Sequence, residues 1–105
     1  MLPLKVPKAA LLRIRQSAQC VEAYFSGYSN DPKSMSLLLE QIQATANKVD
    51  ATVTLYHTGF DFHLFITQIP KSAGRRAFLS TSLRSLFYNY RVRHVTFWNM
   101  NTPLF

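Results

Sequence analysis

The sequence predicts a single α+β domain over residues 1–105, with elements in the order α-α-β-β-α-β. We expect a three-stranded, mainly antiparallel sheet with helices packed on one face. A chain of 105 residues has the length of one domain with one core. Its composition, 48% hydrophobic and only 16% charged, is too apolar for a disordered chain. The spacing of apolar residues changes from helical to alternating at Ala51, which separates helices from strands.

The first half of the chain predicts two helices. Residues 1–7 are expected to be irregular, and a helix is expected from Lys8 to Phe25. Its apolar residues recur at three- and four-residue steps: Leu11, Ile14, Ala18, Val21 and Phe25. Asp31 and Pro32 suit the start of a second helix, which continues to Lys48 or Asp50.

Two alternating segments predict a β-hairpin, Thr52 to His57 and Phe60 to Ile69, joined by a turn at Thr58 and Gly59. This turn pairs His57 with Phe60, Leu55 with Phe62 and Val53 with Leu64, so one face of the hairpin is almost wholly apolar. His57 and His63 then lie on opposite faces.

The C-terminal part predicts a third helix and a last strand. Ser72 is a good cap for a helix over Ala73 to Tyr90, with Leu79, Leu83, Leu86 and Tyr90 on its apolar side. Ala77, Thr81, Arg84 and Tyr88 fall on the opposite side. A strand from Arg91 to Asn99 follows, and residues 100–105 are expected to be irregular because Pro103 interrupts strand pairing.

The net charge of +7 is unevenly distributed along the chain. Residues 1–21 contain four basic residues and no acid, a block of +4. Residues 22–61 hold all five acids and two lysines, or −3, and residues 62–105 hold six basic residues and no acid, or +6. Such polarity indicates a positive face for an anionic partner. The longest apolar stretch is interrupted by polar residues, so we expect no membrane span.

The residue types that carry catalysis or metal binding show no convergent spacing. The candidate metal ligands are His57, His63, His94 and Cys20, and the two hairpin histidines diverge, so no metal and no cofactor are expected. Cys20 is predicted mid-helix as an inert, semi-buried thiol. Since the acids are also scattered, we expect a protein that is not an enzyme.

Two basic segments are the strongest functional signals. Lys71, Arg75 and Arg76 surround the predicted start of the third helix, where free amides attract anions. Arg84, Tyr88 and Arg91 follow at i, i+4 and i+7, and Arg93 and Trp98 extend this mixture of arginine and aromatic residues. Arginines neutralise phosphates and aromatic rings stack on bases in sites for single strands. Arg13 and Arg15 are possible contributors.

The leading hypothesis is therefore a nucleic-acid-binding domain, with RNA favoured because neither a helix-turn-helix nor a zinc motif is visible. The alternative is a protein-interaction module that docks on an acidic partner, self-associates through its sheet edge as a dimer, or docks through the tail Pro103, Leu104 and Phe105. A single cysteine indicates the cytoplasm. The acid-free basic N-terminus also fits a mitochondrial targeting segment.

Overall fold

A computed structural model describes residues 4–26, 32–58, 61–92 and 94–105, and shows an α+β fold built on one sheet. Its elements are β1 (Leu4–Lys5), α1 (Lys8–Ser17), β2 (Cys20–Ser26), α2 (Pro32–Lys48), β3 (Thr52–Thr58), β4 (Asp61–Thr67), α3 (Ala73–Asn89) and β5 (His94–Trp98). The strand order is β1-β3-β4-β2-β5. All neighbours are antiparallel except β1, whose two residues pair in parallel with β3.

The prediction of one long first helix from Lys8 to Phe25 is wrong. The helix ends at Ser17, Ala18 is extended with φ −137°, and residues 20–26 form β2 in the interior of the sheet. Val21 and Phe25 misled the prediction because a step of four residues returns to the same side of a helix and also to the same face of a strand. The sheet therefore has β2 and β1 in addition to the three predicted strands.

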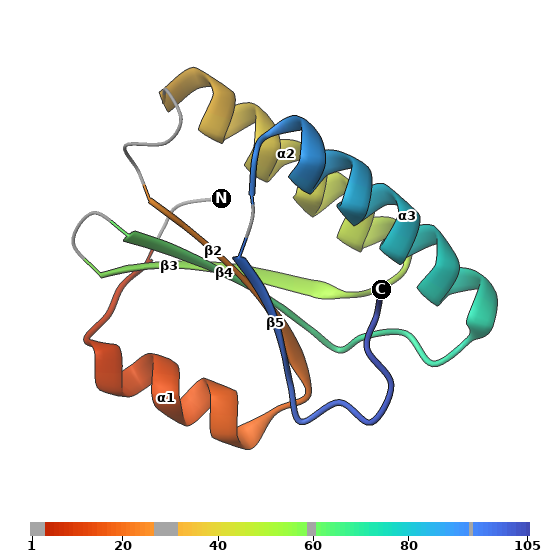
Figure 1. The fold of residues 1–105 in the computed structure, drawn as a ribbon, viewed down its shortest axis with the longest axis horizontal. Coiled ribbons are helices and arrows are strands. Elements are labelled where there is room, and N and C mark those ends of the chain that lie inside the picture. The colour runs from red at the N-terminus through yellow and green to blue at the C-terminus, as the bar shows by residue number, and fades with distance from the viewer. Residues whose placement is uncertain (1–3, 27–31, 59–60, 93) are drawn as a thin grey trace.

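The helices cover both faces of the sheet, and the prediction of one covered face is also wrong. Figure 1 shows α1 on one side and α2 with α3 on the other. The larger core lies under α2 and α3 and contains Val21, Leu55, Leu64 and Ile66. The smaller core lies under α1 and contains Leu11, Cys20 and Phe65. Cys20 is therefore a strand residue, fully buried, and burial raises the pKa of its thiol.

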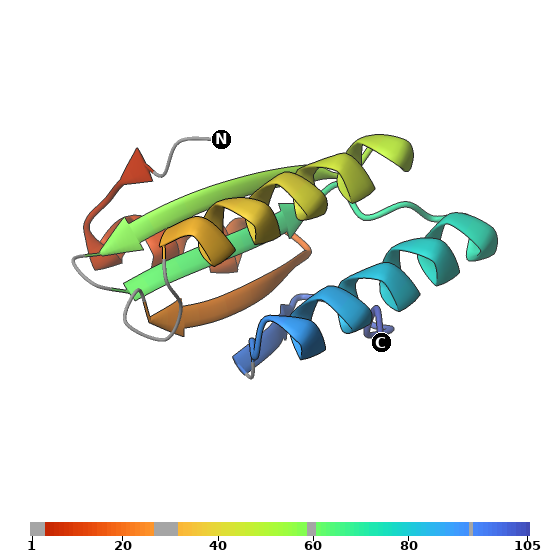
Figure 2. The same cartoon turned by 90° about the horizontal axis from the view of Figure 1, so that it is seen from above.

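Residue alternation along β2 explains how both faces are filled. Val21, Ala23 and Phe25 face the α2 and α3 side, whereas Cys20 packs in the core beneath α1. Residues 4–21 are thus part of the fold. Figure 2 shows α2 and α3 lying side by side over the sheet.

The hairpin of β3 and β4 has the predicted faces but not the predicted register. Thr58 pairs with Asp61 and His57 with Phe62, two residues further along β4 than expected. An even shift preserves which side chains share a face, so Leu55, now opposite Leu64, stays in the core. Gly59 lies outside the described residues.

The second helix confirms its predicted end at Lys48, while Asp31 lies outside the described residues. The third helix confirms its cap, because Ser72 Oγ accepts a hydrogen bond from the Arg75 backbone amide. Within the described ranges, no helix is both long and apolar enough to cross a membrane.

The C-terminal residues 100–105 have no helix or strand, as predicted, but they are packed against the body of the protein. Leu104 is 7% exposed within the larger core, and the Phe105 ring contacts the rings of Phe87 and Phe97. Leu104 and the Phe105 ring are thus engaged within the protein, so docking through this tail would first require these contacts to open.

Candidate functional site

Two residues of the predicted nucleic-acid site, Arg84 and Tyr88, lie together on the exposed side of α3. Leu79, Leu83 and Phe87 turn into the core, which leaves Arg84 and Tyr88 on the solvent side, one helical turn apart. Tyr88 is 85% exposed, whereas the next most exposed large apolar side chain of the described residues, Leu12, is 52% exposed. The sequence of α3 contains no acidic residue.

The end of α3 places Arg91 next to Tyr88. Arg91 has a left-handed φ of 58°, and its amide donates to the Tyr88 carbonyl. The Val92 amide donates to the Phe87 carbonyl, which completes a Schellman motif. A hollow of about 470 Å³ lined by Phe87, Tyr88, Asn89, Arg91 and Val92 lies here. We call the exposed side chains of Arg84, Tyr88 and Arg91 the α3 site.

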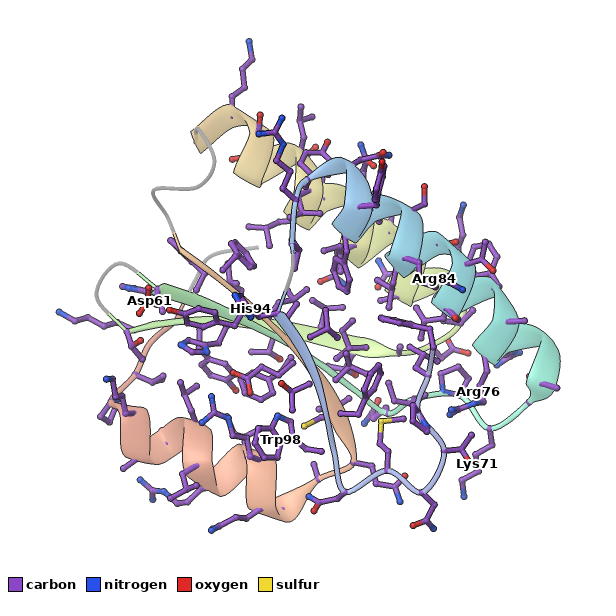
Figure 3. The ribbon with its side chains drawn as sticks, viewed as in Figure 1. Asp61, Lys71, Arg76, Arg84, His94 and Trp98 are labelled. Atoms are coloured by element: carbon purple, nitrogen blue, oxygen red, sulfur yellow. The ribbon has the colours of Figure 1, made fainter. Side chains whose placement is uncertain are left out.

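The basic cluster at the start of α3 is partly used by the fold. Arg76 Nη2 donates to the carbonyls of Thr102 and Pro103, at 3.1 and 3.4 Å, and so holds the C-terminal tail. Arg75 lies 3.4 Å from the carboxylate of Asp50. Lys71 is exposed beside Arg76 (Figure 3). The amides of Arg75 and Arg76 are both bonded to Ser72, so fewer amides are free for an anion than expected.

Trp98 lies apart from the α3 site, although the sequence analysis grouped it with Arg84, Tyr88 and Arg91. Its ring lies on the α1 side of the sheet, away from Arg84 on α3 (Figure 3), and its Nε1 donates to Glu22 at 3.0 Å. The alternating pattern placed Trp98 correctly on β5. It could not show that the face of the sheet on which Trp98 lies is covered by α1. Arg93 lies outside the described residues.

A buried polar network under α1 was not predicted. Glu22 is 4% exposed on β2, and its two carboxylate oxygens accept from Arg15 Nε and Nη2, each at 2.7 Å. His63 Nδ1 donates to the same carboxylate at 2.7 Å, and Trp98 Nε1 is the fourth donor. Arg15 also lies over the Trp98 ring, 5.3 Å from its centroid. This network fastens α1 to three strands, and it engages the guanidinium of Arg15, which the sequence analysis named among the nucleic-acid contacts.

The network also sets the protonation of Glu22. Burial by itself would raise the pKa of this carboxyl, but hydrogen bonds from His63 and Arg15 and the charge of Arg15 outweigh it. They lower the pKa to about 2. Glu22 therefore stays ionised at neutral pH, and its carboxylate oxygens are occupied by these donors.

We expect the free energy of unfolding to fall at acidic pH, because Glu22 becomes protonated there. Because the folded pKa is below the ordinary value of 4.5, the carboxylate stabilises the fold fully above about pH 5. That contribution, about 3 kcal/mol, is lost as pH falls towards 2. Urea unfolding between pH 7 and pH 2.5 measures it. A Glu22→Gln variant with the same pH slope as the wild type would contradict this assignment.

A cavity of about 270 Å³ adjoins the network between α1 and the sheet. Because a carboxylate only accepts, His63 Nδ1 carries the proton and Nε2 lies 3.4 Å from Thr58 Oγ1. The geometry is a histidine oriented by a carboxylate, but that carboxylate already accepts from Arg15 and Trp98. These contacts therefore anchor α1 to the sheet. Within the described residues, no group of three or more His, Cys, Asp or Glu side chains is placed to hold a metal.

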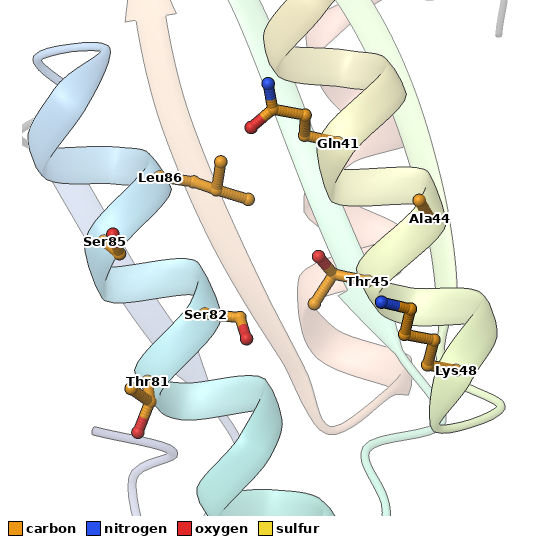
Figure 4. Close-up of a pocket in the computed structure, with 8 residues that line it drawn as sticks. All are labelled: Gln41, Ala44, Thr45, Lys48, Thr81, Ser82, Ser85 and Leu86. Carbon is orange, nitrogen blue, oxygen red and sulfur yellow. The ribbon is translucent and has the colours of Figure 1, made fainter.

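A second hollow, of about 490 Å³, lies between α2 and α3 (Figure 4). It is lined by Gln41, Ala44, Thr45 and Lys48 from α2 and by Thr81, Ser82, Ser85 and Leu86 from α3. We call it the α2–α3 groove. Five of its eight lining residues carry a hydroxyl or amide group, Lys48 adds one cation, and the lining contains no carboxylate. The sequence analysis did not find it, because its two sides are about 40 residues apart in the chain.

No protein-family model matches this chain, and no curated protein is significantly similar to it in sequence.

Proposed function

We propose that this protein is a non-enzymatic domain that binds single-stranded nucleic acid through the α3 site. The observation that carries the proposal is Tyr88, an aromatic ring almost fully in solvent, with Arg84 one turn before it and Arg91 three residues after it. In the free protein this apolar ring is exposed to water, which is unfavourable. Stacking on a base would remove the ring from water. The two guanidiniums supply the charge for the flanking phosphates.

The electrostatics of the described surface also support an anionic partner. Three of the acids have partners in the fold: Glu22 in the network under α1, Asp50 with Arg75, and Asp61 with the Tyr24 hydroxyl. Among the described residues, no salt bridge engages Arg84 or Arg91. Cations without carboxylate neighbours keep their attraction for phosphate.

The experiment is fluorescence anisotropy with labelled single-stranded and double-stranded RNA and DNA over a salt series. We expect single strands to bind best at near-physiological salt. The double variant Arg84→Gln/Arg91→Gln should lower the salt slope by about 2, because two phosphate contacts are lost. Tyr88→Ala should weaken binding by about 1–3 kcal/mol with little change in slope.

The matched control is Lys5→Gln/Lys8→Gln, which removes two exposed positive charges from β1 and from the start of α1, the helix on the opposite face of the sheet from α3. If this control weakens binding as much as the arginine variant, the attraction is non-specific and the α3 site is not the interface. Binding of the wild type only at very low salt has the same meaning.

The second candidate function is self-association through β5. This strand pairs with β2 alone among the described strands, so its other edge presents unpaired backbone groups. A dimer seen by light scattering, together with no nucleic-acid binding, would favour this function or docking on an acidic protein. We propose the cytoplasm as the compartment, with the mitochondrion as the alternative.

A further inference from the structure

The α2–α3 groove contains five side chains whose hydrogen-bonding groups are unused. Gln41, Thr45, Thr81, Ser82 and Ser85 line it, and in the described part of the chain none of them has a side-chain hydrogen bond. Helical serines and threonines often bond the carbonyl one turn earlier, and Ser17 does so in α1. The groove hydroxyls do not, so their capacity to donate and accept is directed outward.

Figure 4 shows three of these groups pointing across the groove. Gln41 and Thr45 extend from α2 towards α3, and Ser82 extends from α3 towards α2. Each of these hydroxyl and amide groups can both donate and accept a hydrogen bond. The groove thus suits a ligand that carries hydroxyl groups rather than a purely anionic or purely apolar one.

The groove neighbours the α3 site along the helix. Ser85 is three residues before Tyr88 and shares the exposed side of α3 with it. At the other end, Lys48 lies 5.9 Å from the ring of Phe78, a second exposed aromatic side chain of α3. Phe78 and Tyr88 are ten residues apart, or about 15 Å along the helix axis. Along α3, Phe78 and Tyr88 therefore flank the groove residues Thr81, Ser82 and Ser85, over a length that matches a strand of a few nucleotides.

Resting on the proposed function, we infer that the α2–α3 groove receives the ribose of a single-stranded RNA whose neighbouring base stacks on Tyr88. The 2′-hydroxyl both donates and accepts, as the groove side chains do, and DNA lacks it. Lys48 supplies a charge for the backbone at the far end of the groove, and no carboxylate in its lining repels a phosphate. The groove therefore gives the domain its preference for RNA over DNA.

The test compares RNA and DNA oligonucleotides of one sequence on the wild type and on Ser82→Ala/Ser85→Ala. Alanine favours the helix, so this variant keeps the fold. We expect the wild type to bind RNA more tightly than DNA by about fivefold for each hydrogen bond made to a 2′-hydroxyl. The variant should lose that preference by weakening RNA binding while DNA binding is unchanged. Ser80→Ala, on the same helix but outside the groove lining, should behave as the wild type.

The outcomes separate this inference from the function on which it rests. If the wild type binds neither RNA nor DNA, the proposed function fails and the inference with it. If it binds both equally through Arg84, Arg91 and Tyr88, the function stands and the ribose assignment is overturned. The assignment is also overturned if the serine variant weakens RNA and DNA alike, or if Ser80→Ala has the same effect.

Discussion

Replacing Glu22 with glutamine is expected to lower the free energy of unfolding by about 3–4 kcal/mol. The carboxylate accepts hydrogen bonds from Arg15, His63 and Trp98. A glutamine keeps the size of the side chain but presents one amide group, whose hydrogens would face donors. Arg15 is also left without its counter-ion in a partly buried place, which is the costly way to break such a pair.

Urea unfolding at pH 7 measures this loss. The matched control is Glu40→Gln on the exposed side of α2, which we expect to change stability by less than about 0.5 kcal/mol. A loss below about 1 kcal/mol for Glu22→Gln would mean that the network contributes little, and that α1 is held mainly by the apolar contacts of Leu11, Cys20 and Phe65.

Shortening Leu104 to alanine is expected to cost about 3 kcal/mol. Leu104 lies in the core beneath α2 and α3, next to a tail held by Arg76 through the Thr102 and Pro103 carbonyls. Removing three carbons from a buried leucine forfeits apolar burial and leaves a cavity that the packed rings of Phe87, Phe97 and Phe105 cannot close.

Thermal or urea unfolding of Leu104→Ala beside Leu12→Ala gives the comparison. Leu12 is a half-exposed leucine on α1, so its truncation should be close to neutral. Equal effects of the two substitutions would show that the tail detaches in solution, and would restore the docking-peptide hypothesis for Pro103, Leu104 and Phe105.

The helical parts of the fold were the most predictable. In α2 and α3 the buried residues recur at helical spacing with a capping residue such as Ser72, and both helices end as expected. The same spacing assigned Arg84 and Tyr88 correctly to the solvent side of α3. These features depend on residues within one or two turns of each other, which is the range over which a periodic pattern carries information.

The errors arose where one pattern fitted two structures. The apolar residues of 20–26 suit a helix or an interior strand, and the choice was made by strands β4 and β5, which are about 35 to 78 residues further along the chain. The hairpin register shifted by two because β3 continues to Thr58. β1 has only two residues and no periodicity to detect.

For the candidate site, local spacing determined which side chains α3 exposes, and the order of residues in the chain showed that no acid lies among them. The partners of Trp98 and Arg76 were decided by tertiary structure, since Glu22 is 76 residues from Trp98 and Thr102 is 26 residues from Arg76. The α2–α3 groove likewise exists only where two helices distant in sequence pack together. Side-chain periodicity shows which face of an element is apolar, but long-range packing decides what covers it.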